Sequence, residues 1–166
     1  MVGLMSQPPF HIVLVHPEIP NNTGTIGRTA AATGCRLHIV HPIGFSMDQK
    51  ARRRAGLDYW AQVDCHEHAS WRAFLDAESP QRGWALTARA ERPVWGGSLQ
   101  RGDYLLFGRE SAGLPEEILA WAVEAWGAES VVGLPMAGGL RSLNLACAAT
   151  AVAYEGLRQL DGADPA

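Results

Sequence analysis

Short apolar segments rich in Val, Ile and Leu alternate along this chain with segments that have the residue spacing of amphipathic helices. The expected strands cover residues 11–16, 36–41, 62–65, 83–88, 103–107 and 130–134. The expected helices cover residues 23–33, 48–55, 70–77, 115–126 and 142–160. Strands that are separated by helices pair in parallel, and the helices then cover both faces of the sheet. The pattern therefore predicts an α/β fold with a mostly parallel sheet and helices on both faces.

Single residues support several of these helix boundaries. Asn22 has a side chain that can cap the first helix, and Gly34 is suited to end it. Pro115 stands in a first turn, where a proline removes no hydrogen bond, and Glu116 and Glu117 favour the positive end of the same helix. We expect these residues to mark the helix ends.

The chain has 166 residues, of which 47% are hydrophobic, which is enough to bury one core. We expect a single domain over 11–160, with flexible tails at 1–10 and 161–166. The longest apolar runs, such as 146–153, are shorter than the roughly 18 to 20 residues of a membrane-spanning helix. The first ten residues contain no basic residue and resemble no secretory signal. These features predict a cytoplasmic protein with no membrane segment.

Three cysteines, Cys35, Cys65 and Cys147, form an odd set without a CxxC spacing. A reducing compartment explains them, and we expect all three to be ordinary buried or half-buried thiols. The sequence CHEH at 65–68 could suggest a metal, but it looks like an exposed strand-to-helix connection and no distant ligand pair accompanies it. We expect no metal site.

Three common enzyme motifs fail a direct check. A dinucleotide-binding turn needs GxGxxG, whereas Gly24 and Gly27 stand apart from any third glycine at that spacing. A hydrolase elbow needs glycine two residues before its serine, and Arg109 occupies that position before Ser111. The single lysine, Lys50, lies outside any glycine-rich turn, which excludes a Walker-type phosphate loop.

A short basic run is the best candidate for binding a polyanion. The formal net charge is −3, so a nucleic acid would have to be met by a local patch. The run consists of Lys50, Arg52, Arg53 and Arg54. A solvated helix face explains these residues equally well on sequence grounds alone.

Three segments that follow expected strands have an unusual composition: 17–34, 106–118 and 134–155. Ligands of open parallel sheets bind at the carboxyl ends of strands. The first segment contains the pattern NxGxIxR, formed by Asn22, Gly24, Ile26 and Arg28. The second contains FGxExxGL, formed by Phe107, Gly108, Glu110, Gly113 and Leu114. The third contains an apolar-Pro-Met strand end and RSxNL, formed by Leu134, Pro135, Met136, Arg141, Ser142, Asn144 and Leu145.

These motifs, in this order, resemble those of the SpoU branch of the SPOUT RNA methyltransferases. The resemblance is close to the subfamily of tRNA 2′-O-methyltransferases that act on the wobble nucleotide, and RRAGLDYW and RAFLDAESPQR extend it over nearly the whole chain. It implies a C-terminal deep trefoil knot that encloses S-adenosyl-L-methionine. By position, the implied cofactor contacts are Leu86, Gly108, Leu134 and Ser142.

Several of these positions also have a purely structural explanation. Gly108 and Gly113 fit a tight turn that needs positive φ. Ser142 could equally be a helix N-cap, and the resemblance favours the cofactor contact. Relatives often have serine where this chain has Ala146, so we assume no hydroxyl contact there.

The implied reaction is methyl transfer to the ribose 2′-hydroxyl of nucleotide 34, a cytidine or a modified uridine. Arg28, Glu110 and Asn144 are the expected catalytic residues. We expect Arg28 to clamp the adjoining phosphate, because a guanidinium is effectively never deprotonated in proteins. Arg141 and the basic run would also contact the substrate.

The expected partners are the anticodon stem-loop of tRNA and a second copy of the chain. The last expected helix has more apolar face than one small sheet covers, and the resemblance implies a homodimer packed through this helix and the first one. Two alternatives are a catalytically silent RNA-binding module on the same fold and a related ribosomal RNA 2′-O-methyltransferase. Intact Arg28, Glu110, Ser142 and Asn144 argue against the silent module.

Overall fold

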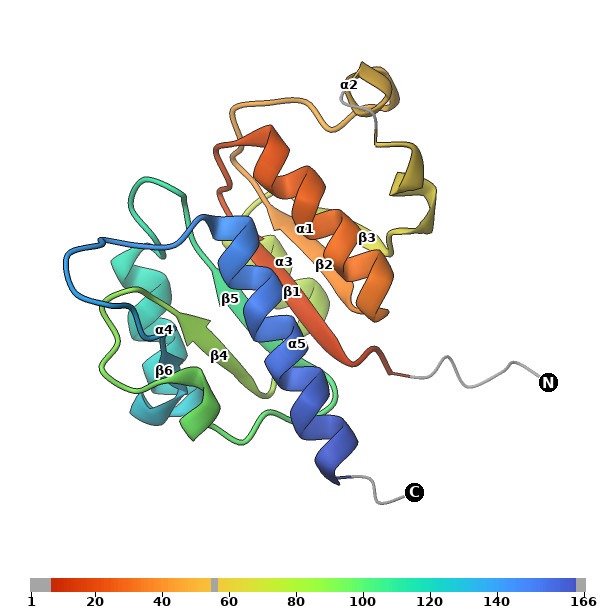
Figure 1. Ribbon diagram of the computed structural model, residues 1–166. Helices are drawn as coiled ribbons and strands as arrows, with labels where there is room; N and C mark the ends of the chain where they lie inside the picture. The colour runs from red at the N-terminus through yellow and green to blue at the C-terminus, as the bar shows by residue number, and fades with distance from the viewer. Residues whose placement is uncertain (1–6, 55–56, 164–166) are drawn as a thin grey trace.

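The computed structural model describes residues 7–54 and 57–163, which form an α/β fold around a six-stranded parallel sheet (Figure 1). The strands are β1 Phe10–Val15, β2 Arg36–Val40, β3 Cys65–His68, β4 Gly83–Leu86, β5 Asp103–Phe107 and β6 Val131–Val132. The α-helices are α1 Pro20–Thr33, α2 Gln49–Arg54, α3 Trp71–Glu78, α4 Glu116–Trp126 and α5 Leu145–Ala163. Three short 3₁₀ helices are η1 Asp58–Gln62, η2 Val94–Gly96 and η3 Ala128–Ser130. The predicted fold class is confirmed.

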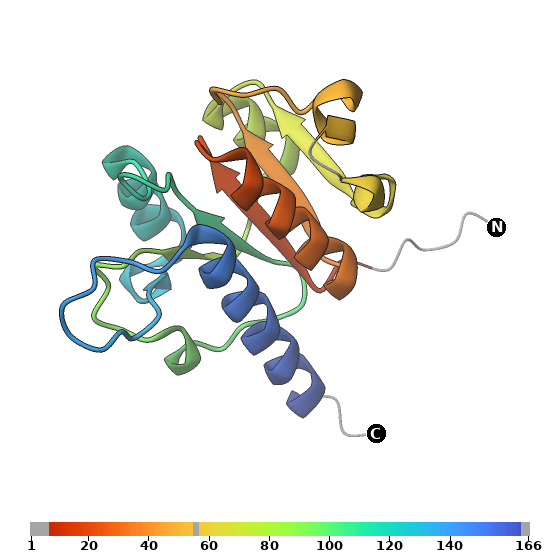
Figure 2. The same cartoon turned by 45° about the horizontal axis from the view of Figure 1, so that its top comes forward.

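Helices cover both faces of the sheet. α1 and α5 lie side by side on one face, and α3 and α4 lie on the other (Figures 1 and 2). Successive side chains of a strand point to opposite faces. Ile12 and Leu14 of β1 therefore pack toward α1 and α5, whereas Val13 and Val15 pack toward α3 and α4. Burial on both faces explains why β1 has no polar alternation.

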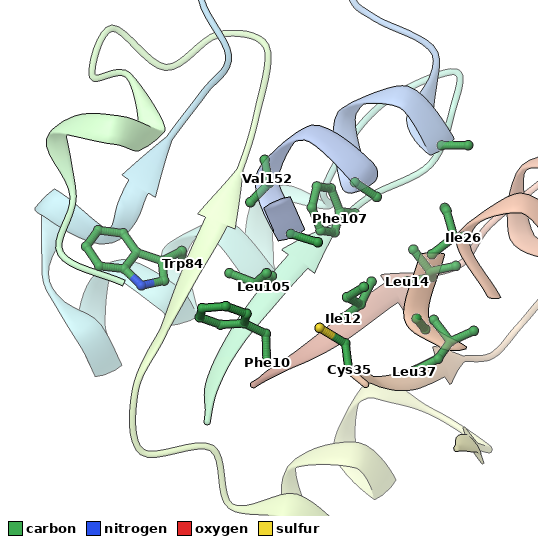
Figure 3. Packing of buried hydrophobic residues seen from close by; sticks show 14 of the residues in the cluster. Phe10, Ile12, Leu14, Ile26, Cys35, Leu37, Trp84, Leu105, Phe107 and Val152 are labelled. Carbon is green, nitrogen blue, oxygen red and sulfur yellow. The ribbon is translucent and has the colours of Figure 1, made fainter. Parts of the chain in front are cut away.

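The larger core lies between the sheet and the two helices α1 and α5. Figure 3 shows Phe10, Leu105 and Phe107 of the sheet beside Val152 of α5, and all four side chains are buried. Fully burying one apolar side chain of this size contributes about 1.5–3 kcal/mol. This layer fixes α5 across β1, so the residues just before α5 are held at the carboxyl edge of the sheet.

The strand order β3-β2-β1-β5-β4-β6 places a switch point between β1 and β5. The chain builds the sheet outward from β1 through β2 and β3, and then crosses to the other side for β4, β5 and β6. Loops that leave neighbouring strands on opposite sides of such a point open a crevice at the carboxyl edge. The segments that follow β1 and β5 meet there.

Several predicted boundaries of strands and helices differ from the observed ones by two or more residues. The strand expected at 62–65 begins at Cys65, because the preceding residues form η1, which buries Trp60. The strand expected at 130–134 contains only Val131 and Val132. The last helix was expected at 142–160 and instead covers Leu145–Ala163.

The predicted cap of α1 is also wrong. The helix begins at Pro20, its N-cap residue is Ile19, and Asn22 lies within the first turn. Gly34 does end the helix, with a left-handed φ of 71°, so that prediction is confirmed. Cys35 is buried and Cys65 is half-buried as expected, whereas Cys147 is exposed, which contradicts the prediction for it. No helix within residues 7–54 and 57–163 is long and apolar enough to cross a membrane.

Candidate cofactor pocket and catalytic residues

A cavity of about 480 Å³ opens at the carboxyl ends of β4, β5 and β6. This volume is in the range of small-molecule sites. Its walls come from the loops after the three strands and from the start of α5, with Ile19 and Asn22 at the start of α1 completing the lining. The four predicted cofactor contacts, Leu86, Gly108, Leu134 and Ser142, all line it. The structure thus brings together four residues that span 57 positions of the sequence, from 86 to 142.

Gly108 is required by a close approach of two backbone segments. A Cβ atom at this position would lie 2.0 Å from the carbonyl carbon of Gly113 and 2.0 Å from the amide nitrogen of Leu114. Arg109 and Gly113 exchange backbone hydrogen bonds of 3.0 and 2.9 Å, which closes the turn. Gly113 has the predicted positive φ, at 70°, but Gly108 does not, so the turn explanation is wrong for Gly108. Leu114 is buried below this turn.

Glu110 lines the cavity and also caps α1 from a distance. Its carboxylate accepts hydrogen bonds from the backbone amides of Glu18, at 2.7 Å, and Ile19, at 3.0 Å. The side-chain amide of Asn22 donates a third, at 3.3 Å. Ile19 has no side chain that could cap the helix, so a residue far along the chain supplies the acceptor. A negative charge is favourable at this helix end.

The reverse contact strengthens the same junction. The Glu18 carboxylate accepts hydrogen bonds from the backbone amide of Ser111, at 3.0 Å, and from its hydroxyl, at 2.9 Å. The Ser111 hydrogen bonds hold the pKa of Glu18 below its usual value. The loop after β1 and the loop after β5 are therefore tied by two carboxylates, one from each side.

Asn144 connects this junction to α5. Its amide nitrogen donates to the side-chain oxygen of Asn22 at 2.9 Å. Its own oxygen accepts from the backbone amides of Ala146, at 2.9 Å, and Cys147, at 3.2 Å. Asn144 is therefore the residue that caps α5. The alternative explanation of Ser142 as the helix cap is wrong, since the helix begins three residues later.

Arg28 lies apart from the cavity. It is exposed on α1, and its guanidinium carbon is 4.5 Å from the centroid of the Tyr59 ring. Arg28 is absent from the residues that line the cavity, whereas Glu110, Arg141 and Asn144 line it. Within the described part of one chain, the predicted catalytic residues therefore form two groups. We name Arg28 with its turn of α1, together with Tyr59 of η1, the Arg28–Tyr59 surface.

The basic run forms the short helix α2, which does not line the cavity. Lys50 and Arg53 are exposed, and Arg52 is half-buried. The side chain of Arg54 lies outside the described residues. α2 lies beyond α1, on the side of the molecule away from β4 and β6 (Figure 1).

Sequence reasoning missed several residues of the site. Thr87, Arg89 and Leu143 also line the cavity, as do Arg109 and Met136, which lie in the motif segments but were assigned no contact. Their position just after a strand is the signal that could have found Thr87, Arg89 and Arg109. Tyr59 was passed over as part of the RRAGLDYW resemblance, and nothing in the sequence pairs it with Arg28.

A row of buried histidines lies beneath α3, on the α3–α4 face of the sheet. His11 Nδ1 is 2.9 Å from His38 Nε2, and His38 Nδ1 is 3.0 Å from His68 Nε2. Burial lowers the pKa of His11 to about 4 and that of His38 to about 2. The CHEH segment thus forms β3 and buries His68, contrary to the exposed connection that we predicted.

This row includes a possible metal-ligand set. Ligand-type atoms of His11, His38 and Glu78 lie within 4.8 Å of one another. Both ring nitrogens of His38, however, are already within hydrogen-bond distance of neighbouring imidazoles. The arrangement is therefore explained by hydrogen bonds among neutral rings.

The parallel sheet, its switch point and the cavity at its carboxyl edge define a ligand-binding α/β protein. A model of the SpoU rRNA Methylase family matches residues 9–154. The chain belongs to this family.

The chain is also similar to particular members of this family. The tRNA (cytidine(34)-2′-O)-methyltransferase of Escherichia coli K12 is 49% identical over 151 residues, which cover 91% of this chain and 94% of the relative. The protein of the same name from Saccharophagus degradans is 46% identical over 151 residues and is covered to 96% of its length.

Solved structures agree with this result. A structure that concerns the 2-OH methylation of C/U34 on tRNA has a TM-score of 0.82 and 47% identity, and the match covers 92% of this chain and 97% of that chain. The SpoU methyltransferase AviRb from Streptomyces viridochromogenes, solved with the cofactor AdoMet, has a TM-score of 0.76 at 27% identity. That match covers 94% of this chain and 62% of that chain.

Proposed function

We propose that this protein transfers the methyl group of S-adenosyl-L-methionine to the ribose 2′-hydroxyl of nucleotide 34 of tRNA, a cytidine or a uridine. One observation carries the proposal. Leu86, Gly108, Leu134 and Ser142 line a single cavity in a chain that is 49% identical to a tRNA (cytidine(34)-2′-O)-methyltransferase. The protein is accordingly an S-adenosyl-L-methionine-dependent tRNA-modifying enzyme.

The volume and the lining of the cavity support binding of the cofactor. Leu86 and Leu134 supply aliphatic walls for a flat adenine, and the closed turn at Gly108 leaves backbone groups at the wall of the cavity. We assign Leu86, Gly108, Leu134 and Ser142 as the residues that hold it. When bound, the cofactor supplies an electrophilic methyl group.

The other site residues have separate roles in this proposal. Arg28 binds the phosphate beside the reacting ribose through its planar fork and stabilises the developing negative charge on the 2′-oxygen. Glu110 and Asn144 act by holding the loops in register, because their polar atoms are engaged by backbone amides and by Asn22. Arg141, at the cavity, and the basic run on α2 bind other parts of the anticodon stem-loop.

We also propose that the enzyme acts as a homodimer. Cys147, Ala151 and Tyr154 are exposed on one face of α5, beside α1, and Tyr154 exposes 52% of its surface. Packing a second copy on α1 and α5 would cover this face. The dimer also accounts for the position of Arg28, because a cavity that lacks its own Arg28 can receive that of the partner copy.

We also propose the bounds of the domain and the topology of its C-terminal segment. A single methyltransferase domain covers 11–160, and its C-terminal segment is threaded into a deep trefoil knot formed by the loops after Leu86, Phe107 and Leu134. The return of α5 from the sheet edge at β6 to a position across β1 supports this path.

Transfer of labelled methyl groups to tRNA, followed by mass spectrometry of the digested nucleosides, tests the function. We expect a 2′-O-methylated nucleotide at position 34 only. A tRNA with deoxyribose at position 34 should bind the enzyme and accept no methyl group. Methylation of a base in that substrate, or of ribosomal RNA in place of tRNA, would contradict the proposal.

A further inference from the structure

Two glycines give α1 a flat strip on which η1 packs. A Cβ atom at Gly24 would lie 3.0 Å from a methyl carbon of Leu57, and one at Gly27 would lie 2.3 Å from the Trp60 ring. Trp60 exposes only 7% of its surface, so its ring cannot move outward without losing buried contact. The segment Leu57–Trp60 therefore packs closely against this strip of α1.

Tyr59 is attached to α1 at two points in this contact. Its hydroxyl donates a hydrogen bond of 2.6 Å to the carbonyl oxygen of Gly24. Its ring lies under the guanidinium of Arg28, with 4.5 Å between the guanidinium carbon and the ring centroid. Gly24 and Arg28 are one helical turn apart, so a single side chain spans the turn that carries Arg28.

Arg28 differs in what holds it from the arginines of the chain that form ion pairs. Five others, Arg36, Arg72, Arg82, Arg89 and Arg158, form ion pairs with carboxylates at distances from 2.7 to 2.9 Å. Among residues 7–54 and 57–163, Arg28 has no carboxylate within ion-pair distance. An aromatic face holds it instead.

This difference has a chemical consequence. A carboxylate occupies the N–H donors of an arginine and neutralises its charge. Fewer donors and less positive charge then remain for a phosphate. An aromatic ring contacts the flat face of the guanidinium and leaves the N–H donors at its edge free. Tyr59 can therefore restrict the long Arg28 side chain without competing with an anion.

We propose that Tyr59 is a positioning residue that holds the Arg28 guanidinium ready for the phosphate beside the reacting ribose. The inference rests on the proposed function of Arg28. The aromatic face is the part that matters, and the hydroxyl serves mainly to fix the ring on α1.

Three variants separate this role from a general effect on folding. Tyr59→Phe keeps the ring, Tyr59→Leu removes it, and Tyr59→Leu combined with Arg28→Ala tests whether the effect passes through Arg28. Single-turnover methyl transfer with excess enzyme measures slow rates, and calorimetry gives the affinity for S-adenosyl-L-methionine. Thermal unfolding of each variant reports any loss of stability.

Tyr59→Leu should lower the single-turnover rate about 2- to 30-fold, the range expected for loss of a cation–π contact. Cofactor affinity should stay at the wild-type value. Tyr59→Phe should recover most of the rate, and in the Arg28→Ala background Tyr59→Leu should have no further effect.

Three results would overturn the inference while leaving the proposed function standing. They are a wild-type rate in Tyr59→Leu, an equal loss in Tyr59→Phe and Tyr59→Leu, and an equal loss from Tyr59→Leu with and without Arg28. Wild-type protein that transfers no methyl group to tRNA would instead overturn the proposed function, and the inference with it.

Discussion

The cavity and the Arg28–Tyr59 surface are built in different ways. The cavity comes mainly from loops at strand ends in the second half of the chain, where backbone segments approach closely around Gly108, and Ile19 and Asn22 add to its lining from the start of α1. The Arg28–Tyr59 surface comes from a helix and a 3₁₀ helix in the first 62 residues, and the Tyr59 side chain makes its contacts, one with the Arg28 guanidinium and one with the Gly24 carbonyl oxygen. The Glu110–Asn22–Asn144 hydrogen bonds are the junction between the two regions.

This difference indicates that the two regions have separate functions. The region that holds the cofactor and the region that holds the substrate phosphate should respond separately to mutation, except at their junction. Disturbing a cavity residue should change cofactor binding, and disturbing Arg28 or Tyr59 should change transfer alone.

The largest expected effect comes from distorting the turn that forms one wall of the cavity. Gly108→Trp should weaken binding of S-adenosyl-L-methionine more than 100-fold, because a side chain at this position overlaps the Gly113–Leu114 backbone. Gly44→Trp is a matched control, since a Cβ atom at Gly44 meets nothing within 4 Å. Calorimetry measures both, and unchanged binding by Gly108→Trp would remove Gly108 from the site.

Breaking the junction should affect both regions at once. Glu110→Ala leaves two backbone amides and the Asn22 amide without their acceptor, and we expect a loss of about 1–2 kcal/mol in the free energy of unfolding. Cofactor affinity and methyl transfer should both fall. Glu124→Ala, an exposed carboxylate on α4, is the control for denaturant unfolding. A loss of transfer with normal stability and cofactor affinity would show that Glu110 acts in the reaction itself.

The histidine row should affect stability without affecting either region directly. Burial lowers the pKa of His11 from 6.5 to about 4, so the unfolded chain binds protons more readily than the folded one. Stability should therefore be full above about pH 6.5 and fall as the pH drops toward 4, by about 1–3 kcal/mol at 1.36 kcal/mol for each unit of pKa. Urea unfolding across this range measures it. Burial lowers the pKa of His38 as well, so His38 contributes in the same pH range. His11→Asn should therefore make the profile less steep without abolishing it, and an unchanged slope would show that His11 does not contribute.

Sequence reasoning succeeded where a local pattern determines the structure. β1, β2 and β5 are buried on both faces, so their apolar runs predicted them within one residue. The four cavity residues were predicted from the resemblance to the family, whose motifs are short segments at the strand ends. Gly34 was found because ending a helix in the left-handed conformation has a strong residue preference.

Sequence reasoning failed where the residue that makes a contact lies far along the chain from the residue it contacts. Ile19 cannot cap α1, so the cap comes from Glu110, and no pattern around Asn22 reveals this. The strand expected at 62–65 was placed too early, because Asp58–Gln62 forms a 3₁₀ helix that packs Trp60 against Gly27. The Arg28–Tyr59 contact depends on that same packing.

The measurement that tests the separation of the two regions most directly is the affinity of Arg28→Ala for S-adenosyl-L-methionine. The same preparation is assayed for methyl transfer to tRNA, with Arg72→Ala as a control arginine on α3. We expect calorimetry to give the wild-type affinity while transfer falls at least 100-fold. A parallel loss of cofactor binding in Arg28→Ala would show that Arg28 supports the cavity, and it would contradict the separation of cofactor and substrate regions.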